Sequence, residues 1–216
     1  VRKDVHYTML YRNADGSDAG MCGNGARCLA VFASSKGLGD TLRFNVHDAV
    51  YEAFVEGEYA EITFPDVLAP HEITSGKHNL LQVYTGTEHV VHFSDKDTLE
   101  DEQALIKLGR QIRGDHQFLP NGTNVNFLCR QHHDELLLQT YEKGVEGLTL
   151  ACGTGAIASA VAAHHHFEED RQSEYKLKVK GGNLGVSFDF DPKENRYRNV
   201  VLKGPATNVF DGHVQI

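Results

Sequence analysis

The pattern Cys-Gly-x-Gly occurs twice in this chain and constrains the fold more than any other feature. It appears in MCGNGARC at residues 21–28 and in ACGTGAIA at residues 151–158. Each copy follows a strand-like stretch and precedes a run with helical spacing of small apolar residues; the first helix is expected to begin near Asn24 and to end near Gly37. A strand, a turn and a helix that recur half a chain apart predict two similar lobes facing each other.

Composition favours a small-molecule substrate. The 216 residues carry a formal net charge of -9 and no run of Lys or Arg, whereas nucleic-acid binding draws on clustered cations. No stretch reaches the roughly 18 uncharged apolar residues of a membrane span. The opening VRKDVHYTML has no hydrophobic signal-peptide core. These observations predict a cytoplasmic protein without nucleic-acid or membrane partners.

The four cysteines fall into two kinds. They are too few for a disulfide scaffold and have no zinc-type spacing, so we expect reduced thiols. Cys28 and Cys129 lie among apolar neighbours and are expected to be small buried residues. Cys22 and Cys152 belong to the glycine turns, and a disulfide between them is the alternative that a cytoplasmic location disfavours.

The remaining chain predicts an α/β (α+β) protein with mostly antiparallel strands. Short runs such as TLRFNV and YAEITF are rich in β-branched and aromatic residues, and residues 97–113 have amphipathic helical spacing. Two prolines in FPDVLAPHE predict a boundary near Pro65. We therefore expect an N-terminal lobe over 1–65, truncated at its start and completed by the C-terminal strand 204–216, and a C-terminal lobe over 66–203.

The two turns together suggest a stereochemical reaction. A cysteine at a helix N-terminus lies beside unpaired N–H groups that favour the thiolate, so the pKa of Cys22 and of Cys152 is expected to be lowered. The adjoining glycines let a carboxylate approach those N–H groups closely. Two such cysteines on opposite sides of one α-carbon can invert it without a cofactor, because one removes a proton while the other supplies one.

Four segments carry a family resemblance. NADGSDAGMCGNGARC, FLPNGTNVNF, YEKGVEGLTLACGTGA and LKGPATNVFDG resemble the diaminopimelate epimerase family in order over nearly the whole chain. The resemblance implies a cofactor-independent epimerase of lysine and cell-wall precursor synthesis, commonly a homodimer. It further implies two pseudo-symmetric lobes, each a sheet or barrel wrapped around a central helix, with the active site in the cleft between them.

The resemblance also assigns roles to individual residues. Cys22 and Cys152 correspond to the acid/base pair, and His89 lies near the cleft, where it adjusts thiol pKa values. Glu142 contacts the substrate ammonium and shares that adjusting role. The other implied substrate-binding residues are Asn13, Gly23, Asn24, Asn124, Lys143, Gly153 and Thr154.

Three departures from the family pattern concern specificity and completeness. Thr87 and Glu88 precede His89 where the family usually has Asn-Pro, which places an extra carboxylate beside the expected cleft. Lys143 stands where the family usually has arginine, so the bidentate contact that arginine makes with a carboxylate is replaced by a single point charge. The usual opening segment of the family does not precede Val1. The alternatives are therefore a racemase of another amino acid with the same fold and an inactive carboxylate-binding relic.

The histidine-rich stretches are not expected to bind metal. Residues 164–166 are consecutive histidines, and residues 132 and 133 form a pair. Successive helical residues point in different directions and cannot close one tetrahedral site. We expect the run at 164–166 to cap or solvate a helix end.

Overall fold

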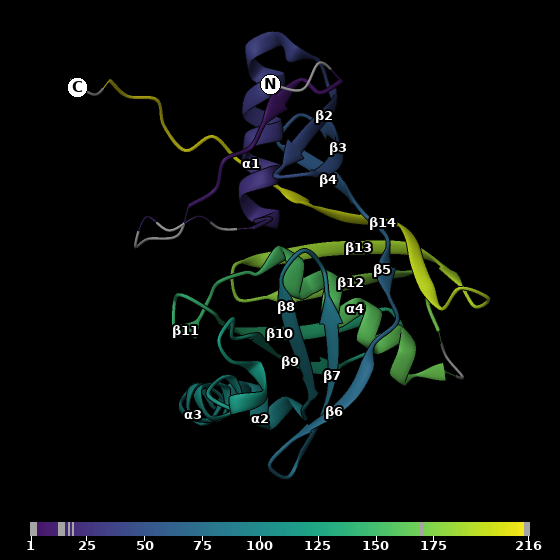
Figure 1. Cartoon of the computed structure of the whole chain (residues 1–216). Coiled ribbons are helices and arrows are strands. Elements are labelled where there is room, and N and C mark those ends of the chain that lie inside the picture. Colours follow the sequence, from purple (N-terminus) through teal and green to yellow (C-terminus); the bar gives the residue numbers. More distant parts are fainter. Residues whose placement is uncertain (1–3, 13–15, 17, 19, 169–170, 214–216) are drawn as a thin grey trace.

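The computed structural model describes residues 4–12, 16, 18, 20–168 and 171–213, so Asn13 lies outside the described residues. The described chain forms one large mixed sheet with helices packed against it, among them α1 (Gly23–Ala33) and α4 (Gly153–His166) (Figure 1). Helix α1 lies against β3 and β4 at one end, and α4 lies against the strands at the other end. The predicted α+β class is confirmed.

The strands form a single path with few parallel neighbours. They are β1 (Tyr7–Thr8), β2 (Thr41–Val46), β3 (Ala49–Glu56), β4 (Tyr59–Phe64), β5 (Val67–Leu68), β6 (His71–Ser75), β7 (His78–Tyr84), β8 (Glu88–Phe93), β9 (Asn124–Arg130), β10 (Glu135–Glu142), β11 (Gly147–Leu148), β12 (Glu174–Val179), β13 (Gly182–Asp191) and β14 (Arg196–Pro205). Their order is β1-β2-β3-β4-β14-β13-β12-β10-β9-β8-β7-β6, with β5 beside β14 and β11 beside β10. Three described pairs are parallel: β1–β2, β8–β9 and β10–β12. Strand β14 therefore joins a first group of strands, β1 to β4, to a second group that runs from β13 to β6 along this order.

Helix α1 turns a row of alanines towards the sheet. Ala26, Ala30 and Ala33 are buried, and their spacing places them on one face. Cys28 falls on the opposite face and is exposed, so the expectation that it is buried is wrong. Cys129, on β9, is buried as expected. Periodicity within α1 shows which residues share a face, but the packing of the strands decides which face is covered.

The chain leaves α1 through one π-helical turn, η1 (Ser34–Leu38). Within it Gly37 has φ of 84°, in the left-handed region that glycine adopts without strain. The predicted end of the first helix near Gly37 is confirmed.

Helix α4 is enclosed by the second group of strands. Each of its residues from Gly153 to His164 is buried, and it contacts β7 to β10 and β12 to β14. A helix with small, mostly apolar residues on all of its faces is typical of such a central position. His164 donates to or accepts from the Tyr197 hydroxyl at 3.0 Å, and burial lowers its pKa to about 4. The expectation that residues 164–166 cap or solvate a helix end is therefore wrong for His164.

The outer helix predicted over 97–113 is two helices. Asp101 separates helix α2 (Lys96–Glu100) from helix α3 (Glu102–Arg113). The Asp101 side chain accepts a hydrogen bond from the Ala104 N–H at 3.0 Å, which makes it an N-cap. A short 3₁₀ helix, η2 (His116–Phe118), follows. Buried Leu105 and Ile112 join α3 to a second hydrophobic cluster under β9 and β10.

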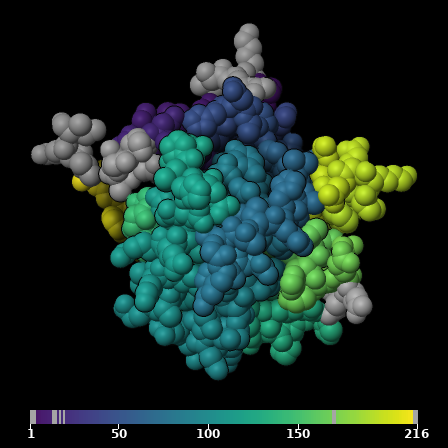
Figure 2. Space-filling view, turned by 60° about the horizontal axis from the view of Figure 1, so that its bottom comes forward, coloured from purple at the N-terminus to yellow at the C-terminus, as the bar shows by residue number. Residues whose placement is uncertain are grey.

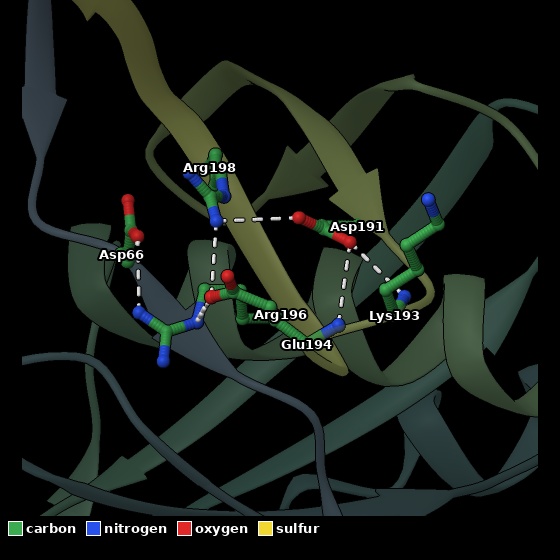
Figure 3. A network of polar contacts seen from close by, with 6 residues as sticks. All are labelled: Asp66, Asp191, Lys193, Glu194, Arg196 and Arg198. Atoms are coloured by element: carbon green, nitrogen blue, oxygen red, sulfur yellow. Dashed lines mark hydrogen bonds and ion pairs between the residues drawn. The ribbon is translucent and has the colours of Figure 1, made fainter.

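Strand β14 also binds the segment that follows β4. Arg196 and Tyr197 pair with β5, and the Arg196 guanidinium contacts Asp66 at 3.5 Å (Figure 3). The same network continues through Glu194 to Arg198, at 3.0 Å, around the β13–β14 turn. The pairing with β4 spans Val200–Pro205. The boundary at Pro65 and the assignment of 204–216 to the first lobe stay predictions.

Figure 2 shows the opposite end of the molecule from α1, where the blue and teal middle of the chain forms the surface. Within the ranges that the structure describes, no helix has the length and apolar character needed to cross a membrane.

Candidate active site

Helices α1 and α4 meet at their first residues. A Cβ on Gly23 would lie 3.1 Å from the Gly153 Cα, and a Cβ on Gly153 would lie 3.0 Å from the Gly23 Cα. Both would also lie 2.8 Å from Leu202 Cδ2, on the strand that joins the two groups of strands. Only glycine permits this approach, so each Cys-Gly-x-Gly turn provides one side of a direct contact between helix N-termini.

Cys22 and Cys152 occupy equivalent positions on the two helices. Each is the N-cap, with φ/ψ of -112°/108° for Cys22 and -120°/110° for Cys152. Each sulfur accepts a hydrogen bond at 3.4 Å from the N–H three residues later, in Gly25 or Gly155. Both thiols are free, Cys22 half-buried and Cys152 buried. The turns thus place two reduced sulfurs beside the joined helix N-termini.

Asn24 links the two turns. Its Nδ2 donates to the Ala151 carbonyl at 2.8 Å, directly before Cys152. The buried Arg27 donates to Asn24 Oδ1 at 2.9 Å and to the Gly23 carbonyl at 3.2 Å. The Asn24 amide, which the family resemblance assigns to substrate binding, therefore also fixes the register of α1 against the loop before α4. Its substrate role stays a prediction.

Cys152 has a raised pKa, contrary to the expectation from its helix N-terminus. Burial is the largest cause, the negative charge of Glu142 adds to it, and together they raise the pKa of Cys152 to about 12. Hydrogen bonds from Thr154 and Gly155 act in the opposite direction but are outweighed. The expectation considered the helix terminus without the desolvation of the thiolate, which disfavours the charged form.

His89 lies against this second turn. It is fully buried on β8, and its Nε2 is 3.0 Å from Thr154 Oγ1, which is 3.5 Å from Cys152 Sγ. Burial, with a smaller contribution from the charge of Lys143, lowers the pKa of His89 to about 3, so the ring is neutral. The structure therefore brings His89 and Thr154 together beside Cys152, while the roles assigned to these residues stay predictions.

Residues 142 and 143 reach the same region from the end of β10. Burial raises the pKa of the half-buried Glu142 carboxyl, which lies near enough to Cys152 to affect that thiol. Asn124, at the start of β9, accepts from the Lys143 N–H at 2.9 Å and donates to the Glu88 carbonyl at 3.0 Å. Its amide therefore ties the β7–β8 hairpin to the loop after β10.

Sequence reasoning missed three polar residues of the site. Thr85 donates to the Thr154 carbonyl at 3.1 Å, and Asn126 contacts His89. The charge of Cys22, burial and a hydrogen bond to Cys22 raise the pKa of Tyr11 to about 12. The Asn-x-Asn spacing of residues 124 and 126 was the available signal, because residues two apart on a strand share a face.

Proteins of one family are similar to this chain in sequence over most of its length. The family model for diaminopimelate epimerase matches residues 81–209. The diaminopimelate epimerase of Aquifex aeolicus is 37% identical over 94% of this chain and 72% of its own length. That of Chlorobaculum tepidum is 35% identical over 97% of this chain and 80% of its own length.

The chain belongs to the diaminopimelate epimerase family. The resemblance stated from the four sequence segments is confirmed.

Solved structures similar to this member of the diaminopimelate epimerase family share its fold at low identity. A hydroxyproline epimerase from Agrobacterium vitis has a TM-score of 0.71 and 13% identity, covering 92% of this chain and 67% of that one. A PhzF-family protein from Bacillus anthracis has a TM-score of 0.70 and 15% identity, covering 97% and 80%. These likenesses agree with a fold of two lobes.

Proposed function

We propose that this protein is a diaminopimelate epimerase, a pyridoxal-independent isomerase that interconverts LL- and meso-2,6-diaminopimelate. The observation that carries the proposal is the contact of Gly23 with Gly153, which sets two N-cap cysteines beside one junction of helix N-termini. Family membership supplies the substrate, and the pair of thiols supplies the chemistry.

The first step is recognition of the α-carboxylate by the helix N-termini. The first intrahelical bonds run from the Ala26 N–H to the Cys22 carbonyl and from the Ala156 N–H to the Cys152 carbonyl. An α-helix leaves the N–H groups before such bonds without an intrahelical acceptor. The groups proposed to hold the carboxylate are those of Gly23, Asn24, Gly153 and Thr154. They meet the negative charge that develops when the α-proton leaves.

The second step transfers protons at the α-carbon between two sulfurs. One thiolate removes the α-proton, and the electron pair is delocalised into the carboxylate. The opposing thiol then donates its proton to the other face of the carbon, which inverts the centre. Burial raises the pKa of Cys152 and so favours its protonated thiol in the free protein, which assigns Cys152 the role of acid in a first turnover and leaves the role of base to the opposing sulfur. Reversing the direction exchanges these roles.

Glu142 and His89 adjust this pair. The charge of Glu142 raises the pKa of Cys152, and a bound substrate ammonium beside Glu142 would compensate that charge. Substrate binding would then lower the pKa of Cys152 when it must accept a proton. His89 acts through Thr154, which contacts the same sulfur.

The far end of the substrate is assigned to Asn13, Asn124 and Lys143. Glu88 is the first residue of β8, and its backbone carbonyl accepts a hydrogen bond from the side-chain amide of Asn124. A carboxylate side chain at residue 88 favours a substrate whose far end carries an ammonium group over one whose far end carries a second carboxylate. Lys143 would hold such a carboxylate with a single point charge. These two residues favour the second candidate, a racemase of another amino acid. Turnover of a panel of amino acids, measured against both diaminopimelate isomers, separates the two.

The test of the function is interconversion of the LL and meso forms by purified protein, resolved by chiral chromatography. We expect activity in the wild type and none in Cys22→Ala or Cys152→Ala. An active Cys22→Ala variant contradicts the two-thiol scheme. Substrate binding by the wild type without α-hydrogen exchange identifies the inactive relic instead.

We propose further that the protein acts in the cytoplasm as a homodimer, as the family resemblance implies. Light scattering coupled to size-exclusion chromatography tests the assembly, since a dimer has twice the 23.9 kDa mass of the chain. Elution as a monomer at all concentrations contradicts it.

A further inference from the structure

The orientation of the Asn126 amide is fixed by its surroundings. Asn126 is fully buried on β9, and its Nδ2 lies 3.0 Å from the Val90 carbonyl, which can only accept a hydrogen bond. The Thr140 hydroxyl donates to Oδ1 at 2.9 Å. The atom facing Val90 must therefore be the nitrogen, and the usual ambiguity between amide oxygen and nitrogen does not arise.

This orientation determines where His89 carries its proton. The second hydrogen of Asn126 Nδ2 points to His89 Nδ1, 3.1 Å away. Because a donor faces Nδ1, that nitrogen must accept and cannot carry hydrogen. A neutral imidazole then has its proton on Nε2, the nitrogen 3.0 Å from Thr154 Oγ1. The lowered pKa of His89 agrees with the neutral ring.

The proton on His89 in turn directs the Thr154 hydroxyl. Thr154 Oγ1 accepts from His89 Nε2–H, so its own hydrogen is available for Cys152 Sγ at 3.5 Å. The Gly155 N–H donates to the same sulfur. If His89 carried its proton on Nδ1 instead, Nε2 would compete for the Thr154 hydrogen and the sulfur would lose one donor.

We propose that Asn126 is a positioning residue whose amide holds His89 in the Nε2–H tautomer and thereby aims the Thr154 hydroxyl at Cys152. The chain of donors runs from Asn126 through His89 and Thr154 to the sulfur. It assists the thiolate form of Cys152, the form that must accept a proton in one direction of the reaction. That catalytic consequence rests on the proposed function, whereas the tautomer and the sulfur contact do not.

The first test is nitrogen NMR of protein labelled with [15N]histidine. The chain has 13 histidines, so the His89 signals are assigned by difference from His89→Gln. We expect wild-type His89 to carry hydrogen on Nε2 alone. A wild-type ring with hydrogen on Nδ1, or on both nitrogens, overturns the proposal whatever the variants do.

The second test compares Asn126→Leu with Thr140→Val. Leucine removes the donor to His89 Nδ1, whereas the control removes a partner of Asn126 Oδ1 and leaves Nδ2 in place. We expect Asn126→Leu to populate the Nδ1–H tautomer and to slow alkylation of Cys152 by iodoacetamide roughly tenfold, the worth of one hydrogen bond to a charged sulfur. Thr140→Val should change neither.

Peptide mass spectrometry reads Cys152 separately from Cys22 and from the exposed Cys28. An unchanged tautomer and alkylation rate in Asn126→Leu overturns the proposal, and so does an equal effect of Thr140→Val. Neither readout requires turnover, so a protein that lacks epimerase activity still decides the question. In an active enzyme, the proposal also predicts a lower kcat in Asn126→Leu with little change in KM.

Discussion

Replacing Gly153 by alanine tests the contact on which the site is built. The new Cβ would lie 3.0 Å from the Gly23 Cα and 2.8 Å from Leu202 Cδ2, whereas carbon atoms in contact are about 3.5–4.0 Å apart. One neighbour is backbone and the other is a fully buried side chain, so the helix N-termini must separate by roughly 0.5–1 Å. Overpacking of this kind lowers the free energy of unfolding by about 1–3 kcal/mol. A shift of about 1 Å between reacting groups lowers the rate about 100-fold.

Gly147→Ala is the matched control, because a Cβ there meets nothing within 4 Å and φ is not positive. Urea denaturation gives the free energy of unfolding of both variants, and exchange of the substrate α-proton with solvent gives the rate. We expect Gly153→Ala to lose both stability and exchange relative to Gly147→Ala. Neutral substitutions scatter within about 0.5 kcal/mol. If the free energies of unfolding of the two variants agree within that range and both exchange the substrate α-proton at the same rate, the contact of Gly23 with Gly153 does not position the site.

Three further predictions concern residues around the site. Asn24→Leu should lower the free energy of unfolding by about 1–3 kcal/mol in urea denaturation, because the Ala151 carbonyl loses its donor; unchanged stability would contradict the link between turns. His164, whose pKa is lowered from 6.5 to about 4, binds its proton more readily in the unfolded chain. Stability should therefore decline as pH falls from 6.5 to 4, and less in His164→Phe; identical pH profiles would refute this. Cys28 should react rapidly with a thiol reagent in the native protein, and Cys28→Ser should remove that reaction and keep the wild-type rate of substrate α-proton exchange; a lower exchange rate would contradict a purely surface position for this thiol.

The sequence allowed prediction of the features that are local. Each Cys-Gly-x-Gly turn begins a helix because the cysteine sulfur caps the N–H three residues on and the glycines admit close approach. The small residues after Gly153 predicted a helix. Because they include no charged face, the burial of this helix on all sides agrees with its sequence. The expectation that His89 lies near the cleft came from the family resemblance, since no local pattern connects residue 89 to residue 154.

The features that could not be predicted depend on which strands are neighbours. The parallel pairing of β8 with β9 places His89 and Val90 beside Asn126, although they precede it by 37 and 36 positions in the chain. The exposure of Cys28 follows from the side of α1 that β3 and β4 cover. The pKa of Cys152 follows from desolvation by surrounding strands, a tertiary effect that outweighs its position at a helix N-terminus.

The central claim is that two sulfurs act on opposite faces of one carbon, and the most direct measurement is early-turnover epimerisation in deuterium oxide. Thiol hydrogens exchange with the solvent, so the opposing thiol delivers deuterium. The account predicts that at low conversion the product carries deuterium at the inverted α-carbon, whereas the remaining substrate carries almost none. Product that keeps the substrate's own α-hydrogen, or equal deuterium in substrate and product from the first turnovers, would show a single base and contradict the account.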